Sequence, residues 1–346
     1  MVTDRLRRLL VLTEGSLNIY DAKMAVAVIR YHPEEVAAVL DSTRAGEALE
    51  AVIGIGRGIP VVATVAEGLA YKPTGLLIGI APAGGALPGS WRASIREAIE
   101  AGLDIISGLH VFLGEDAEFA SLAERQGVTI WDVRRVPADT PVAGLRAASV
   151  PSLRVLTVGS DCCSGKMVTA IELTKGARWR GWDAEFVATG QIGIVVSGAG
   201  LVIDRAIADF CAGAAEQLVL ERSNRQVLFL EGQGSLIHPS YSGVTLSLLH
   251  GSAPQALILC HEPGRKVVQE HTVPIPPLRE LVELYERAAE PVYPSRVVGL
   301  SLMCVGLPEA QAQEAVARAH EETGLPATDP VRFGVEPLLD RLKEML

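Results

Sequence analysis

Residues 153–173 read LRVLTVGSDCCSGKMVTAIEL, and this stretch decides the fold of the second part of the chain. An aliphatic strand over Val155–Val158 runs into the loop Gly159–Lys166, and a helical pattern begins at the end of that loop. In a strand–loop–helix of this kind, backbone N–H groups and the helix N-terminus converge on an anion, and a lysine adds a point charge. The stretch therefore predicts a phosphate-binding loop in an α/β domain.

The loop departs from the usual phosphate-loop pattern. Five residues separate Gly159 from Gly165 where the usual loop has four, so Ser160 takes the place of the first glycine. Met167 stands where Ser or Thr normally coordinates Mg²⁺, and Thr169 lies two residues further along the helix. Phosphate binding is the favoured interpretation. A glycine-rich turn with a surface lysine is the alternative, and metal binding through the loop stays open.

A second motif, QVLFLEGQGSLIHP at residues 226–239, ends a short apolar strand in Glu231. A phosphate-loop protein places its metal-binding or water-orienting carboxylate at the carboxyl end of such a strand. Glycines in the following turn allow backbone to approach a ligand closely, and His238 comes after them. Glu231 is therefore predicted to be a site residue; the alternative is a strand-terminal glutamate that caps a nearby helix.

Other loops of the second part carry weaker signals. Gln191 follows a predicted strand, and Arg265 ends the loop His261–Arg265, where it could clamp a carboxylate or phosphate with two hydrogen bonds. Asp204 and Asp209 lie on a predicted helix and are interpreted as solvated or capping residues.

Three stretches in the first part of the chain are weaker candidates for ligand binding. The loops Ala81–Gly85 and Ser107–His110 follow predicted strands, and ligands of open α/β sheets bind beyond the carboxyl ends of strands. The stretch Gly54–Gly58 has no complete dinucleotide fingerprint.

Cys162 and Cys163 lie where a helix N-terminus could lower a thiol pKa, but the sequence identifies no paired histidine, so filling of the loop is the favoured role.

Short aliphatic runs alternate with helical patterns along the chain, which favours parallel sheets covered by helices. The segment Arg134–Pro151 interrupts this rhythm with three prolines and is the predicted linker, so we expect two domains, residues 1–148 and 149–346. The predicted strands are Arg8–Thr13, Glu35–Leu40, Pro60–Thr64, Gly75–Ile80, Leu103–Ser107, Val128–Asp132, Arg154–Gly159, Ala184–Thr189, Gln226–Glu231, Gln255–Cys260 and Val297–Met303. The predicted helices are Trp91–Ala101, Ala117–Gln126, Gly165–Arg180, Ile203–Glu221, Ser242–His250, Pro277–Ala289, Pro308–Thr323 and Glu336–Met345.

Composition narrows the classes of partner. The 346 residues carry 31 basic and 41 acidic side chains, a net charge of −10 without a basic run, which argues against nucleic acid or an anionic membrane. Proline and glycine punctuate the uncharged stretches, and the N-terminal apolar run is too short for a signal peptide. The five cysteines form no C-x-x-C pair, so neither a zinc site nor a disulfide framework is indicated. We expect a cytoplasmic protein, and 49% apolar residues leave room for a homo-oligomer interface.

Several long blocks give the chain a resemblance to a known family. The blocks GSDCCSGKMVTAIEL, ATGQIGIVVSGAG, IDRAIADFCAGAAE, FLEGQGSLIHPSYSGVTLSLLHG and ALILCHEPGR resemble the D-glutamate N-acetyltransferase family, and IGIAPAGGALPGSWRASIREAIEAGLDIISGLHVFL resembles its N-terminal domain. The resemblance implies a Rossmann-like first domain and a P-loop NTPase-like second domain. A wider resemblance is to dethiobiotin synthetase and the cobyrinic acid amide synthases, whose loop has the same five-residue gap but a threonine where Met167 stands.

This resemblance implies acetyl transfer from acetyl-CoA to the amino group of D-glutamate, in the catabolism of D-amino acids. Acyl transfer to an amine needs a base for the ammonium proton, donors for the developing oxyanion and a carboxylate clamp. Glu231, His238 and His110 are the candidate bases, and Gln191 and Arg265 are the candidate substrate-binding residues. This reaction needs no metal. The phosphates of CoA would lie on the loop residues Gly159, Ser160, Asp161, Cys162, Cys163, Ser164, Gly165, Lys166 and Met167.

Two other functions stay open. An ATP-dependent kinase or ligase of the dethiobiotin synthetase type would place Lys166 on the β- and γ-phosphates and hold Mg²⁺ with Glu231. A nucleotide-binding regulatory module would bind without turnover. The missing Ser or Thr after the lysine counts against the first of these.

Overall fold

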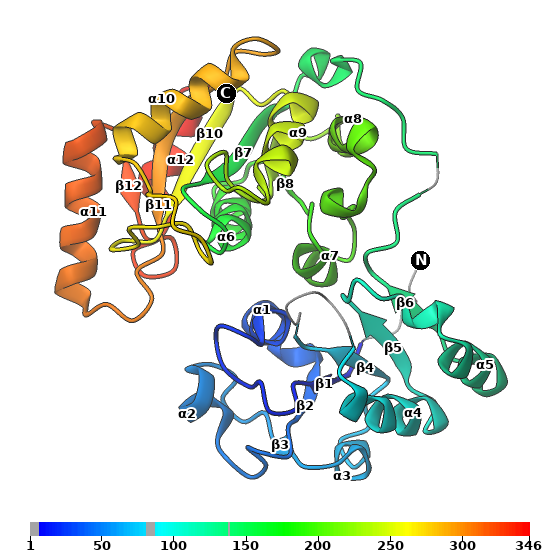
Figure 1. The fold of residues 1–346 in the computed structure, drawn as a ribbon. Helices are drawn as coiled ribbons and strands as arrows, with labels where there is room; N and C mark the ends of the chain where they lie inside the picture. The colour runs from blue at the N-terminus through cyan, green and yellow to red at the C-terminus, as the bar shows by residue number, and fades with distance from the viewer. Residues whose placement is uncertain (1–6, 81–86, 138) are drawn as a thin grey trace. The chain divides into compact units, whose positions relative to one another are not determined.

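The computed structural model describes residues 7–80, 87–137 and 139–346 and divides the chain into two compact units (Figure 1). The first unit comprises residues 1–135 together with residues 194–198, and the second comprises residues 136–193 and 199–346. Each unit is built on a six-stranded sheet with parallel neighbours, so the predicted α/β class is confirmed.

The first unit has the strand order β3-β2-β1-β4-β5-β6, which is the order of a Rossmann-like sheet. Its strands are β1 (Leu9–Leu12), β2 (Val36–Leu40), β3 (Val61–Val62), β4 (Gly75–Ile78), β5 (Asp104–Ser107) and β6 (Ile130–Asp132). Its helices are α1 (Lys23–Tyr31), α2 (Leu49–Ile53), α3 (Val65–Leu69), α4 (Arg92–Glu100) and α5 (Ala117–Gln126).

All strands predicted for the first part of the chain are present, as are α4 and α5. The sequence does not predict α1, because its N-cap Ala22 makes no side-chain hydrogen bond and its first turn holds no acidic residue. The stretch Gly54–Gly58 connects α2 to the start of β3, so it does not lie beyond the carboxyl end of a strand. The loop Ala81–Gly85 lies outside the described residues.

The second unit has the strand order β12-β11-β10-β7-β9-β8. Its strands are β7 (Leu153–Gly159), β8 (Ala184–Val187), β9 (Val227–Leu230), β10 (Ala256–His261), β11 (Arg296–Leu302) and β12 (Ala327–Thr328). Its helices are α6 (Lys166–Trp179), α8 (Ala208–Leu220), α9 (Ser242–Ser252), α10 (Leu278–Ala289), α11 (Glu309–Thr323) and α12 (Glu336–Lys343). The short strand β12 is not predicted, and the predicted helix Ile203–Glu221 is wrong in one respect: a 3₁₀ turn over Ile203–Arg205 precedes α8.

The sequence also does not predict helix α7 (Gln191–Ser197), whose last residues belong to the first unit. There the carbonyl of Val195 accepts a hydrogen bond from the Arg7 guanidinium at 3.1 Å, and the carbonyl of Val196 lies 2.9 Å from Nε2 of His32. The segment 194–198 is thus tied to the first unit by side chains from the chain's beginning.

The predicted linker packs on helix α8. The buried carboxylate of Glu216 accepts hydrogen bonds from the backbone N–H groups of Gly144 and Arg146. It also forms an ion pair with the Arg146 guanidinium at 2.7 Å. A Cβ added to Gly213 would lie 1.7 Å from the carbonyl oxygen of Pro141, so only glycine fits on α8 at this contact. Burial raises the pKa of Glu216, but the Arg146 guanidinium and the two amides outweigh it and lower the pKa.

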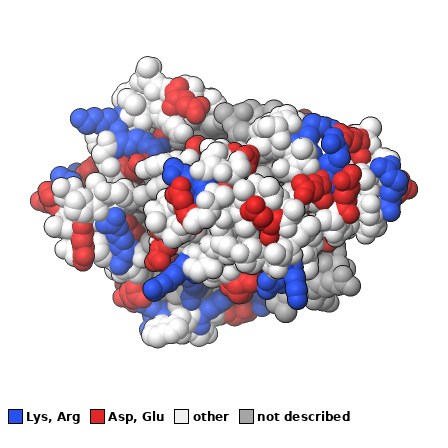
Figure 2. All heavy atoms as spheres, turned by 90° about the horizontal axis from the view of Figure 1, so that it is seen from below, with Lys and Arg blue, Asp and Glu red and all other residues white. Residues whose placement is uncertain are grey.

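The core is aliphatic, as the composition predicts, and β7 and β9 are buried along their whole length. No helix within the described residues is both long and apolar enough to cross a bilayer. On the face shown in Figure 2, basic and acidic side chains alternate rather than forming an extended area of one sign.

Candidate anion-binding and proton-transfer site

The sequence motifs of the second unit meet at the carboxyl edge of its sheet. Strand β7 pairs with β10 on one side and with β9 on the other, with Gly159 opposite Cys260 and Leu156 opposite Leu230. The loops that follow β7, β8, β9 and β10 therefore start from neighbouring strand ends (Figure 1). In an open parallel sheet this edge is where ligands bind.

The loop after β7 has the geometry of an anion site. Helix α6 starts at Lys166, and its N-cap Gly165 has a φ of +93° and provides no side-chain cap. The backbone N–H groups of Gly165, Lys166 and Met167 have no acceptor among the described residues. The buried ammonium of Lys166 donates to the carbonyl of Asp161 at 2.6 Å and to Oγ of Ser164 at 3.3 Å. A negatively charged group can accept all of these donors.

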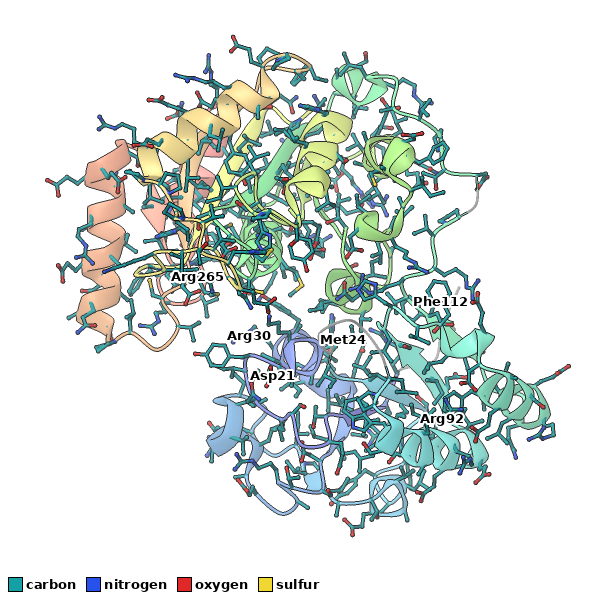
Figure 3. All side chains as sticks on the ribbon, in the orientation of Figure 1. Asp21, Met24, Arg30, Arg92, Phe112 and Arg265 are labelled. Carbon is teal, nitrogen blue, oxygen red and sulfur yellow. The ribbon has the colours of Figure 1, made fainter. Side chains whose placement is uncertain are left out.

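Asp161 and Arg265 hold this loop in shape. The fully buried Asp161 carboxylate accepts a hydrogen bond from the Arg265 guanidinium at 2.8 Å, from the N–H of Gln269 at 2.8 Å and from the N–H of Cys162 at 2.7 Å. Arg265, labelled in Figure 3, also donates to the carbonyl of Cys162 at 2.9 Å and pairs with Glu262. These contacts show that Arg265 supports the loop; the substrate clamp stays a prediction.

Glu231 follows β9 and is buried beside the loop. Its Oε2 accepts hydrogen bonds from the N–H groups of Thr189 at 3.0 Å and Gly190 at 3.1 Å, which lie beyond β8. Burial raises the pKa of Glu231 to about 7, although the two amides, Gln233 and the nearby Lys166 ammonium lower it. A carboxyl group with this pKa exchanges a proton near neutral pH, as a general base must.

His238 is buried in the turn after Glu231. Its Nδ1 accepts a hydrogen bond from the N–H of Ser240 at 3.2 Å, and this contact assigns the ring proton to Nε2. Nε2 lies 4.0 Å from Oδ1 of Asp161. Burial lowers the pKa of His238, against the attraction of the Asp161 carboxylate. The neutral ring is therefore arranged to donate a hydrogen bond through Nε2.

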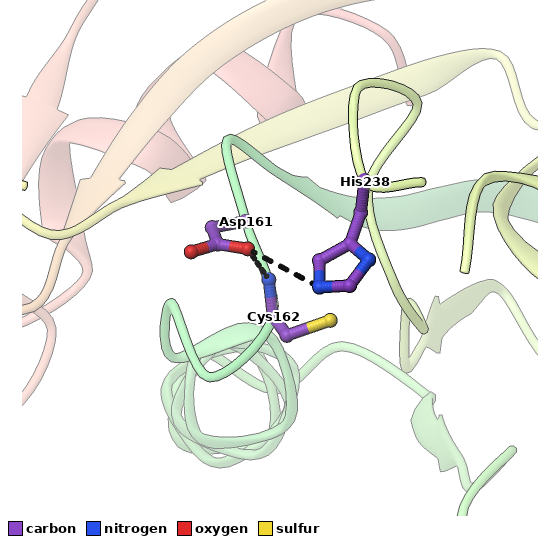
Figure 4. A group of neighbouring side chains, drawn as sticks. All are labelled: Asp161, Cys162 and His238. Atoms are coloured by element: carbon purple, nitrogen blue, oxygen red, sulfur yellow. Dashed lines mark hydrogen bonds and ion pairs between the residues drawn. The ribbon is translucent and has the colours of Figure 1, made fainter. Parts of the chain in front are cut away.

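Asp161, Cys162 and His238 form one cluster, whose possible ligand atoms all lie within 4.8 Å of one another (Figure 4). Three such side chains can hold zinc. In the tautomer that the Ser240 contact assigns, however, Nε2 of His238 carries a proton instead of a free lone pair, and Asp161 is already bonded to Arg265 and two amides. These contacts favour a hydrogen-bonded cluster over a metal site.

The surroundings of Cys162 agree with its favoured role as a residue that fills the loop, although the sequence does not identify the histidine beside it. A histidine, His238, does lie beside it, and burial raises the pKa of the Cys162 thiol to about 11, with no net lowering by the helix N-terminus. The thiol is protonated at neutral pH, which makes it a poor nucleophile. No disulfide joins the cysteines of the described residues.

One residue that supports the site, Tyr285, lies far away in the sequence, and no motif indicates it. The buried hydroxyl of Tyr285 on α10 donates to the carbonyl of Gly159 at 2.7 Å and accepts from the N–H of Leu236 at 3.2 Å. The N–H of Gly232 donates to Oγ1 of Thr157 at 2.9 Å, and a Cβ added to Gly232 would lie 1.6 Å from the Thr157 carbonyl oxygen. The turn after Glu231 is thereby pressed against β7.

The remaining candidates lie around or outside this cluster. Gln191 starts α7, directly after Gly190 and its hydrogen bond to Glu231. His110 is exposed in the first unit, in the loop after β5. Asp204 and Asp209 are exposed, in agreement with their interpretation as solvated residues.

Fold and site together define a two-domain α/β protein with a Rossmann-like first domain and a P-loop second domain. Residues 42–136 match "Domain of unknown function (DUF1611_N) Rossmann-like domain", and residues 141–339 match "Domain of unknown function (DUF1611_C) P-loop domain". The chain belongs to this DUF1611 family.

Three relatives place the chain within the family. A D-glutamate N-acetyltransferase of Tritonibacter scottomollicae is 39% identical over 285 residues, which cover 81% of this chain and 84% of that protein. A D-glutamate N-acetyltransferase of a Pseudoalteromonas species is 39% identical over 269 residues, covering 77% and 80%. The crystal structure of a DUF1611 family protein from Anabaena variabilis is 41% identical with a TM-score of 0.94, covering 98% of this chain and 99% of that chain.

Proposed function

We propose that this protein transfers the acetyl group of acetyl-CoA to the amino group of D-glutamate. The observation that carries the proposal is the 39% identity, over most of the chain, to two proteins named D-glutamate N-acetyltransferase. The site supplies groups that this chemistry needs: an anion-binding loop, a buried carboxylate with a pKa of about 7 and a neutral histidine that donates through Nε2.

In the proposed reaction, Glu231 takes one proton from the ammonium of the acceptor. The amine nitrogen then attacks the thioester carbonyl, the C–N bond forms, and the negative charge on the oxygen is stabilised by hydrogen-bond donors such as Nε2 of His238. The C–S bond breaks as the carbonyl reforms, and the second nitrogen proton passes to the leaving CoA thiolate. The products are N-acetyl-D-glutamate, free CoA thiol and one proton, which Glu231 releases to solvent.

The residues after the loop bear on the ATP-dependent alternative. Met167 offers no oxygen for Mg²⁺, and Oγ1 of Thr169 is bonded to the carbonyl of Gly165 at 2.9 Å and to Oγ of Ser301 at 2.7 Å. The carboxylate of Glu231 is bonded to two amides. These contacts favour chemistry that needs no metal at the loop.

One pair of assays tests the proposal. The protein is incubated with D-glutamate and either acetyl-CoA, with free thiol followed, or Mg-ATP, with ADP followed; L-glutamate serves as the control acceptor. We expect thiol release that depends on D-glutamate. Release of ADP without thiol would overturn the proposal in favour of a ligase, and the absence of both products would favour a binding module.

A further inference from the structure

The anion-binding loop and Glu231 form a single small site. The Lys166 side chain runs between β7 and the turn after β9: a Cβ added to Gly159 would lie 2.8 Å from its Nζ, and a Cβ added to Gly232 would lie 3.1 Å from its Cδ. Gly232 is the chain neighbour of Glu231, and the Lys166 charge lowers the pKa of Glu231. An anion bound on the loop therefore lies next to the proton acceptor.

The short distance between the loop and Glu231 distinguishes the two substrates as possible ligands of the loop. In acetyl-CoA, every phosphate is separated from the reacting thioester by the long pantetheine arm. In an amino acid, the α-carboxylate and the ammonium are attached to the same carbon. If CoA phosphates occupied the loop, an extended arm would carry the acetyl group away from Glu231, whereas an acceptor carboxylate on the loop keeps the ammonium beside it.

We propose that the loop Gly159–Met167 binds a carboxylate of the amino-acid acceptor, with its ammonium facing Glu231, and that the phosphates of CoA bind elsewhere. This inference rests on the proposed function and changes the ligand expected from the sequence. The N–H groups of Gly165, Lys166 and Met167 and the Lys166 ammonium suit a carboxylate. A carboxylate also needs no metal to neutralise it, in contrast to a triphosphate, and this agrees with Met167 at the position of the usual magnesium ligand.

The test measures the binding of two probes to the full-length protein by calorimetry: glutarate, which has the acceptor's carboxylates but no amine, and CoA. In Lys166→Met we expect glutarate to bind about tenfold to a hundredfold more weakly, because a charge-assisted contact is lost, and CoA to bind within about twofold of the parent. Lys175→Met, on the exposed side of the same helix, is the matched control, and thermal unfolding verifies that both variants are folded.

A second measurement needs no variant. Inorganic phosphate, a small anion that fits the loop, should raise the apparent Kd of glutarate and leave that of CoA unchanged. The inference is overturned if phosphate competes with CoA, if the folded Lys166→Met variant loses affinity for CoA, or if glutarate fails to bind the parent. Failure of the proposed function is a separate result, because absence of D-glutamate-dependent thiol release leaves both binding measurements intact.

Discussion

The carboxylate of Glu231 accepts two backbone hydrogen bonds, which lower its pKa, yet burial raises that pKa to about 7. The ionised form is the base, so activity that depends on it is present above about pH 7 and is lost as the pH falls below it. We expect Glu231→Gln to lower kcat/KM about a hundredfold or more and to abolish the inflection near pH 7. A pH–rate profile of both proteins checks this.

The raised pKa of Glu231 can also be tested through the pH dependence of protein stability. A carboxyl group whose folded pKa exceeds its unfolded value binds its proton more tightly in the folded state, so stability falls as the pH rises from about 4.5 to 7. Because Glu231→Gln removes this contribution, the melting temperature of the variant relative to that of the parent should rise between about pH 4.5 and 7. An unchanged trend in the variant would show that Glu231 titrates at its ordinary pKa.

Substitutions of His238 distinguish donation of a hydrogen bond by this residue from general base catalysis. Its Nδ1 accepts the N–H of Ser240, so Nε2 carries the proton. We expect His238→Gln, which keeps an N–H near that position, to retain more activity than His238→Ala, whose kcat should fall about a hundredfold. Equal loss in both variants would favour a base at this position.

The sequence predicted the loop, Glu231 and His238 because strand ends of a parallel sheet must share an edge. It could not predict the hydrogen bonds of Arg265 to the loop, since the partners Asp161 and Cys162 lie about a hundred residues earlier in the chain. Nor could it predict the pKa shifts, because they depend on burial, which only the folded chain defines.

At the scale of the elements, the loop after β7 is held by the loop after β10. Removing the Arg265 guanidinium leaves the Asp161 carboxylate buried with two amides but without its ion-pair partner. We expect Arg265→Met to lower the free energy of unfolding by about 2–3 kcal/mol, with Arg287→Met on the surface of α10 as the control. Denaturant unfolding measures this. Unchanged stability with a raised KM for D-glutamate would instead favour a substrate clamp.

The turn after β9 packs on β7 with no room for a side chain. A Cβ at Gly232 would lie 1.6 Å from the carbonyl oxygen of Thr157, whereas a Cβ at Gly243 on α9 meets no atom within 4 Å. We expect Gly232→Ala to lower the free energy of unfolding by about 3 kcal/mol, and Gly243→Ala to leave it unchanged or raise it by up to about 1 kcal/mol. Equal effects of the two changes would contradict this packing.

The sequence predicts the helices and strands whose hydrophobic pattern is long and regular, and it does not predict those that are short or lack such a pattern. The buried strands β7, β9 and β10 are continuous aliphatic runs bounded by glycine or polar residues. Helix α7 is short and rich in Ile, Val and Gly, which have low helix propensity, and β12 has only two residues. Such elements form because their surroundings stabilise them.

For the molecule as a whole, Glu216 holds the first residues of the P-loop domain, around Gly144 and Arg146, on α8. Its buried carboxylate is bonded to Gly144 and Arg146. We expect Glu216→Gln to lower the free energy of unfolding by about 2 kcal/mol and to make the bonds around Pro141–Arg146 more sensitive to limited proteolysis. Glu221→Gln, at the exposed end of α8, is the control, and equal cleavage of the two variants would contradict this role.

Residues 194–198 belong to the first unit although the chain on both sides of them belongs to the second, and this limits how the two domains can be exchanged between genes. The chain leaves the first unit after residue 135, returns to it for these residues, and leaves it again at residue 199. Recombination at one point would separate the first unit from the segment that bonds Arg7 and His32. The two domains are therefore expected to be exchanged between genes as a pair. A hybrid that replaces only the second domain must carry, at positions 194–198, residues that match the first domain that it keeps.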